Sequence, residues 1–125
     1  MNPYVLAAGI ASVAMGLVHS VLGERLLLTE LLRRQGLPPV LGSSRFSGQI
    51  LRFAWHVTTV LLWTVATLLF VLAERPAGGE WTLALRIVAA GNLGCALVAG
   101  TITRGRHFAW LGFLAIAALA WLGSR

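Results

Sequence analysis

The sequence predicts an all-α integral membrane protein, an up-and-down four-helix bundle that forms one domain over residues 1–125. Hydrophobic residues make up 58% of the chain and charged residues only 11%, whereas a soluble domain carries about 25% charged residues. The mean hydropathy is +0.81. Four apolar stretches, each close to the ~20 residues that cross a bilayer core as a helix, lie at 3–23, 53–73, 83–103 and 107–123. Nearly all of the chain is therefore needed to span a membrane.

The connections between these stretches differ in length. The first apolar stretch runs into GERLLLTELLRRQG, which we expect either to extend the first helix or to lie in the membrane interface. The turn LPPVLGSS follows, and Ser43 or Ser44 is placed to cap the second helix. The other two connections, ERPAGGE and TRGR, are short. Consecutive helices are therefore expected to run up and down.

The arginines divide unequally between the two ends of these helices. The net charge of +6 would suggest nucleic acid in a soluble protein, but here the charges lie in short loops beside apolar segments, so we expect no nucleic-acid partner. The end with the 24–52 connection holds Arg25, Arg33, Arg34, Arg45, Arg52, Arg104 and Arg106. The other end holds Arg75, Arg86 and Arg125. By the positive-inside rule, the first end faces the cytoplasm and both termini lie outside.

The first two helices each carry a seam of residues at alternating steps of three and four, the spacing of a packed helix pair. On the first helix this register gives Gly9, Ser12, Gly16, His19 and Gly23. On the second it gives Gln49, Arg52, His56, Thr59 and Trp63. Small residues let membrane helices approach closely, and lipid does not tolerate a polar face. The polar seam is therefore predicted to face the bundle interior or a wet cavity.

Asn92 falls near the middle of the third apolar stretch. Polar side chains at this depth commonly form hydrogen bonds between membrane helices. We expect Asn92 to be a structural residue that bonds to a neighbouring helix.

The three histidines are predicted to share one membrane level. His19 ends one helix near the cytoplasmic side, while His56 and His107 begin two others there, so their depths should agree within about two turns, or ~10 Å. Glu24 lies just beyond His19. Histidine is the commonest ligand of zinc, copper and iron. We therefore predict a transition-metal site formed by His19, His56, His107 and Glu24, although the zinc-protease and di-iron bundle motifs are absent.

Arg52 also favours other ligands. A fixed positive charge one turn from His56 repels a cation unless Glu24 neutralises it, but it attracts an anion, so Arg52 and Gln49 are predicted to bind an anionic ligand group. Haem b is the second cofactor candidate, with His56 and His107 as opposite ligands of the iron and the propionates on arginines. A quinone or a lipid headgroup could occupy the same place.

Readings without a cofactor also stay open. The polar residues could form only hydrogen bonds and ion pairs that hold the helices together. The chain could be an accessory subunit of a larger membrane complex, or a homo-oligomer, that uses the apolar faces of its last two helices. The sequence shows no nucleophile–base pair and no phosphate-binding loop, so catalysis has no support at this stage.

Two short segments carry a resemblance to a known group of proteins. HSVLGER at 19–25 and LRFAWH at 51–56 resemble segments of small four-helix membrane proteins of bacteria. The resemblance covers mainly the first two helices and the loop between them. It implies a location in the bacterial inner membrane and no particular activity.

Overall fold

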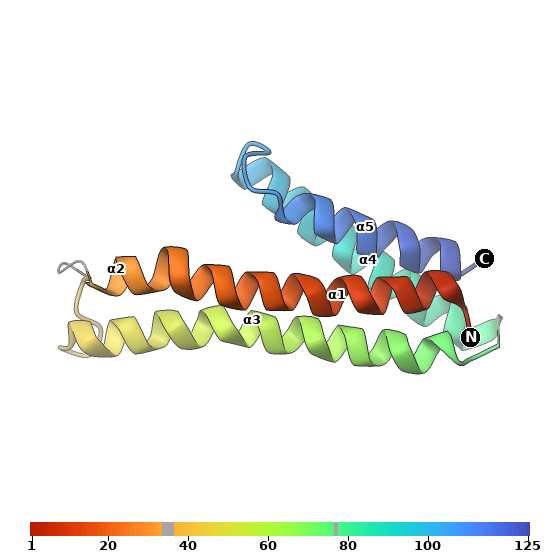
Figure 1. The fold of residues 1–125 in the computed structure, drawn as a ribbon, viewed down its shortest axis with the longest axis horizontal. Coiled ribbons are helices and arrows are strands. Elements are labelled where there is room, and N and C mark those ends of the chain that lie inside the picture. Colours follow the sequence, from red (N-terminus) through yellow and green to blue (C-terminus); the bar gives the residue numbers. More distant parts are fainter. Residues whose placement is uncertain (34–36, 77) are drawn as a thin grey trace.

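The computed structural model describes residues 1–33, 37–76 and 78–125, and over these residues the chain is all-α, as predicted (Figure 1). One isolated pairing, Val40 with Ser43, closes a turn. The helical elements are α1 (Pro3–Leu22), the π-helical segment η1 (Gly23–Leu28), α2 (Thr29–Arg33), α3 (Ser44–Ala73), α4 (Gly79–Ile102) and α5 (Ala109–Gly123). Arg34, which contributed to the predicted charge asymmetry, lies outside the described residues.

The first helix is longer than its apolar stretch because the chain stays helical through η1 and α2. Asn2 caps its start, and the Asn2 side chain accepts hydrogen bonds from the backbone N–H groups of Tyr4 and Val5. The helical run then continues over 31 residues to Arg33. This confirms one of the two alternatives for the segment that follows the first apolar stretch, namely that it extends the first helix.

The second helix also begins well before its apolar stretch. The predicted cap is confirmed at Ser43, whose hydroxyl accepts the Phe46 N–H at 3.2 Å. α3 consequently has 30 residues, which is about 45 Å of helix and more than the ~30 Å hydrocarbon core requires. The hairpin formed by the helical runs Pro3–Arg33 and Ser44–Ala73 is therefore longer than a bilayer crossing requires.

Three of the four predicted spans are long and apolar enough to cross a membrane within the described chain: Pro3–Arg33, Ser44–Ala73 and Gly79–Ile102. The prediction that the fourth stretch, 107–123, also spans the membrane is corrected. α5 has only 15 residues, about 22 Å of helix, which falls short of the ~30 Å core. The helix starts at Ala109 rather than at His107, because His107 and Phe108 belong to the turn from α4.

α1 lies along α3 through the predicted glycine positions. Trp55 faces Gly23, Trp63 faces Gly16 and Phe70 faces Gly9, and a Cβ atom at any of these glycines would collide with the opposing ring. At Gly16 such an atom would lie 2.5 Å from the Trp63 indole nitrogen. Three large aromatic side chains of α3 therefore pack directly against the glycine backbone of α1.

α1, α3, α4 and α5 all meet at one end of the molecule only, which is called the closed end below. The buried core consists of Val5, Ala8, Leu69, Leu72, Ala73, Leu85, Ala89, Ile116 and Ala120. These residues belong to the start of α1, the end of α3, the first half of α4 and the second half of α5. From that end the α4–α5 hairpin diverges from the α1–α3 hairpin (Figure 1).

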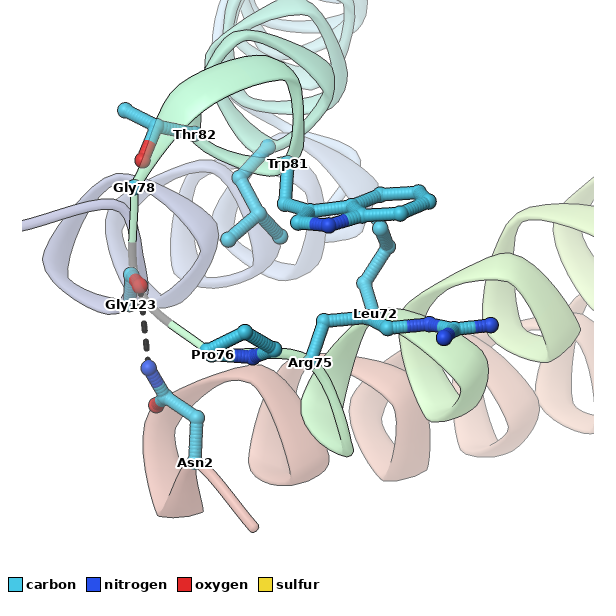
Figure 2. A pocket seen from close by; sticks show the side chains of 9 residues that line it. Asn2, Leu72, Arg75, Pro76, Gly78, Trp81, Thr82 and Gly123 are labelled. Atoms are coloured by element: carbon cyan, nitrogen blue, oxygen red, sulfur yellow. Dashed lines mark hydrogen bonds between the residues drawn. The ribbon is translucent and has the colours of Figure 1, made fainter.

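Hydrogen bonds join both chain ends to this closed end. The Asn2 backbone N–H donates to the Ala73 carbonyl at 2.7 Å, and the Asn2 side-chain amide donates to the Gly123 carbonyl at 2.9 Å (Figure 2). The Arg75 guanidinium lies over the Trp81 ring, 5.0 Å from its centroid. The cavity between them holds about 10 Å³, room for about one water molecule, so it is too small for a ligand.

The prediction for Asn92 was wrong in its hydrogen bond. The side chain is buried, but its amide donates to the Val88 carbonyl one turn earlier in α4, at 2.9 Å. A helical amide can satisfy itself on its own backbone in this way, as Thr and Ser hydroxyls do. This bond therefore does not join α4 to a neighbouring helix.

Candidate functional site

The α1–α3 seam ends in a hydrogen-bonded cluster formed by Ser20, Glu24, Arg52 and His56. Arg52 holds the Glu24 carboxylate in a bidentate pair, with Nη2 to Oε1 at 2.6 Å and Nε to Oε2 at 3.1 Å. The His56 Nε2 lies 3.2 Å from Glu24 Oε2, and the His56 Nδ1 lies 2.9 Å from the Ser20 hydroxyl. The structure thus brings together three of the predicted site residues, Glu24, Arg52 and His56, and adds Ser20.

The local backbone explains how these side chains meet. Arg52 and His56 are one turn apart on α3, so they lie on one face. Glu24 belongs to η1, where the Thr29 N–H reaches back to the Glu24 carbonyl across five residues. This wider turn occurs often at functional sites. Ser20 lies four residues before Glu24 on the same helical run, so two residues of each helix face each other.

The hydrogen bonds fix the roles of the His56 nitrogens. An ionised carboxylate can only accept, so the Nε2 beside Glu24 must carry a proton. In the neutral ring Nδ1 is then unprotonated, and the Ser20 hydroxyl donates to it. Ser12, Thr64 and Thr67 instead donate to the carbonyl four residues earlier in their own helices, which makes the direction of the Ser20 hydroxyl distinctive.

His19 takes part in a separate arrangement. Its ring stacks on Trp55, with centroids 4.5 Å apart and planes 5° from parallel. Its Nε2 lies 2.7 Å from the Thr58 hydroxyl and 3.2 Å from the Trp55 carbonyl, while the Trp55 indole donates to the His19 carbonyl at 3.1 Å. His19 therefore joins α1 to α3 rather than reaching the Glu24–His56 pair.

His107 does not join the other two histidines, and the prediction that the three rings converge was wrong. The turn that carries it stands apart from α1 and α3, at the diverging end of the α4–α5 hairpin (Figure 1). Its Nδ1 accepts the Ala109 N–H at 3.2 Å, so it acts within its own turn. Over the described chain, no three His, Cys, Asp or Glu side chains are placed to hold one metal ion. The proposed ligand set His19, His56, His107 and Glu24 is thus divided.

The same divergence bears on the expected haem arrangement. His56 and His107 were predicted to ligate iron from opposite sides, but they belong to the two hairpins that separate (Figure 1). The four-helix core ends too early to bring α5 beside this part of α3, because its buried residues lie near the termini.

A groove lies next to the cluster, between α2 and the beginning of α3. It encloses about 310 Å³, and its lining includes Leu32, Leu37, Ser44, Arg45, Gln49 and Arg52. Within the described part of the chain no carboxylate forms an ion pair with Arg45. Arg52 belongs both to this groove and to the cluster, so the two features are continuous.

Thr59 is the next polar position on the same face of α3. It is 3% exposed, and its hydroxyl is the buried side-chain polar atom that lacks a hydrogen-bond partner among the described residues. A helical threonine usually bonds to its own backbone. A free donor thus lies about one turn deeper than His56.

When the closed end is taken as one face of the hydrocarbon core, the helix lengths put the cluster at the other face. Counting ~20 residues, or ~30 Å, from the closed end of the bundle reaches Gly23 on the first helix and Phe53 on α3. Ser20 and His56 then lie just inside this boundary and Glu24 and Arg52 lie on it. By the same count Gln49 lies about 6 Å and Arg45 about 12 Å beyond this boundary, so the groove runs outward from Arg52 through the headgroup region, which adds about 5–7 Å on each side.

Comparisons of this chain with protein-family models, with curated proteins and with solved structures gave no match. The resemblance of residues 19–25 and 51–56 to small bacterial membrane proteins therefore stays a prediction.

Sequence reasoning missed Ser20, Trp55 and Thr58. Trp55 and Thr58 lie beside the chosen register of α3 and so were passed over. Ser20 precedes Glu24 by four residues, a spacing that places both on one helical face. That spacing, beside a polar face on the next helix, was the available signal.

Proposed function

We propose that this protein binds an anionic amphiphile of the phospholipid class in the groove between α2 and α3. The observation that supports this is the lining of the groove, which combines Arg45, Arg52 and Gln49 with the leucines 32 and 37. A phosphate needs positive charge and hydrogen-bond donors, and an acyl chain needs an apolar surface. Both are present in this groove, which begins at Arg52 on the calculated hydrocarbon boundary.

The start of α3 adds to the anionic preference. Ser44 and Arg45 belong to the first turn of a 30-residue helix, whose N-terminus carries partial positive charge and free N–H groups. Arg45 is exposed. Because it forms no ion pair with a carboxylate among the described residues, no such pair has to break before it binds a phosphate. Arg52 is already shared with Glu24, so Arg45 is expected to make the larger contribution.

Two exposed leucines add apolar surface to the helical hairpin that carries the groove. Leu26 is 72% exposed and Leu41 is 87% exposed, although both lie in or beside the helical hairpin that extends from the core. Apolar side chains at this level are favoured in the interface, where they insert below the headgroups. They give the hairpin a surface for acyl chains.

Binding should depend on Arg45. Loss of a hydrogen bond to a charged group costs about 1.5–3 kcal/mol, so Arg45→Ala should weaken the affinity for phosphatidylglycerol by at least about tenfold. Native mass spectrometry of the detergent-solubilised protein, titrated with an ether-linked phosphatidylglycerol, measures this directly.

Arg86→Ala is the matched control, because Arg86 lies on α4 over the Trp121 ring and away from the groove. An Arg45→Ala variant that binds as tightly as Arg86→Ala would contradict the proposal. Competition by inorganic phosphate alone would identify a site for the free anion rather than for lipid. Co-purification of a stoichiometric protein partner without lipid would favour the accessory-subunit reading.

We also propose the inner membrane of a bacterium as the location, with the groove on the cytoplasmic side. The described arginines near the groove outnumber those of the closed end, and both termini lie at that closed end (Figure 1). A C-terminal alkaline phosphatase fusion in a bacterial host should therefore be active, since this enzyme folds only outside the cytoplasm. A fluorescent C-terminal fusion with an inactive phosphatase would reverse the orientation.

A further inference from the structure

We infer that Ser20 is a nucleophile activated by His56, and that its substrates are acyl esters of membrane amphiphiles. A hydroxyl on α1 donates to the free nitrogen of an imidazole on α3, and a carboxylate holds the other nitrogen of that ring. Ser20, His56 and Glu24 thus form a continuous chain of hydrogen bonds at 2.9 and 3.2 Å.

This chain meets the requirements for an activated serine. A nucleophilic hydroxyl needs a base within about 2.6–3.2 Å, and the base needs a third group that orients it. Glu24 fixes the His56 ring with Nδ1 toward Ser20, in the tautomer that can accept a proton. The same logic operates on unrelated folds and is recognised by geometry rather than by order in the sequence.

The surroundings allow a substrate to reach Ser20. Ser20 and His56 are both half-buried, at the edge of the hydrocarbon core, where lipid ester groups and water meet. Arg52 lies one turn from His56 on α3, and Glu24 takes two of its five N–H groups. The remaining groups can donate to an oxyanion, which requires such donors.

The reaction balances with water as the co-reactant. Ser20 Oγ attacks the acyl carbonyl, and its proton passes to His56 Nδ1. The tetrahedral intermediate collapses, the ester C–O bond breaks, and the leaving alkoxide takes that proton to become an alcohol. Water then attacks the acyl-serine with His56 again as base, which releases a carboxylic acid and restores the serine. The net change is hydrolysis of one ester bond.

The choice of substrate rests on the proposed function. Arg52 lies one turn, about 6 Å, from His56 on the same face and also lines the groove. A phospholipid whose phosphate occupies the groove would therefore have its glycerol esters on the Ser20 side, deeper in the membrane. The nucleophile itself does not depend on this placement.

An alkyl fluorophosphonate tests the nucleophile. Incubation of the purified protein in detergent should add one phosphonyl group to Ser20, with loss of fluoride, as located by peptide mass spectrometry. Ser20→Ala should abolish the modification, and His56→Ala should slow it by about 10²-fold or more. Ser12→Ala is the matched control, because that hydroxyl is buried and donates to its own helix, and it should be labelled at the parent rate.

Vesicles of diacyl phosphatidylglycerol test the substrate class. The parent should release fatty acid, and Ser20→Ala, checked for an unchanged circular dichroism spectrum, should not. Absence of labelling in the parent, equal labelling of Ser20→Ala, or no Ser20-dependent release of fatty acid would each overturn the inference. Binding of the ether-linked lipid is measured separately, so a bound lipid with an unreactive Ser20 rejects only the nucleophile. A reactive Ser20 without lipid binding rejects only the groove.

Discussion

Replacing Gly16 with leucine should separate α1 from α3 and cause a large loss of stability. A Cβ atom at Gly16 already meets the Trp63 indole at 2.5 Å, and leucine adds three further carbons in the same direction. Overpacking of a well-packed interior typically costs about 1–3 kcal/mol and sometimes more. We expect the upper part of this range, because the opposing group is a large ring whose N–H also bonds to the Val13 carbonyl.

Reversible unfolding in mixed micelles measures this effect. Gly94→Leu is the matched control, since Gly94 lies inside α4 and a Cβ there has no neighbour within 4 Å. Both variants replace a mid-helix glycine with the same side chain, so their difference reports the contact with Trp63. Equal free energies of unfolding for the two variants would show that the α1–α3 seam does not limit stability.

The second large effect concerns the Arg52–Glu24 pair, whose coupling should be at least about twice that of an exposed helical ion pair. Polar contacts between membrane helices average about 0.6 kcal/mol and reach about 1.7, and bidentate pairs belong to the stronger ones. The two side chains are 48% and 32% exposed, and by the residue count they lie on the hydrocarbon boundary. We therefore expect water to screen this pair less than a pair on a soluble surface.

A double-mutant cycle with Glu24→Ala and Arg52→Ala isolates this coupling, because the contact of Glu24 with His56 is lost equally in the presence and absence of Arg52. The Glu30–Arg33 pair, with its 2.6 Å contact and side chains 42% and 77% exposed, provides the comparison. For that pair a coupling of about 0.3–0.5 kcal/mol is expected, as for exposed helical pairs. The same small value for both pairs would place the Arg52–Glu24 pair in water rather than at the hydrocarbon boundary.

The sequence by itself determined the all-α class, three of the spans, a serine cap at position 43 or 44 and the glycine positions of the close helix contact. These properties are local or periodic. Hydropathy over ~20 residues selects a span, a hydroxyl before a helix selects its start, and small residues at steps of three and four mark a close contact. The periodicity also put Arg52 and His56 on one face of α3, and Glu24 was chosen because it lies just beyond His19.

Only the tertiary structure decided which polar groups meet. Sequence places His19, His56 and His107 at one membrane level, but depth along a helix does not fix lateral distance. The core that joins all four helices is confined to the end near the termini, and the short α5 and its hairpin diverge from there (Figure 1), so His107 is removed from the other two. The π-helical turn at η1 and the rotation of α1 against α3 then set Ser20 and Glu24 on the two nitrogens of His56. Such a contact depends on side-chain direction in two helices at once, and no spacing within either helix specifies it.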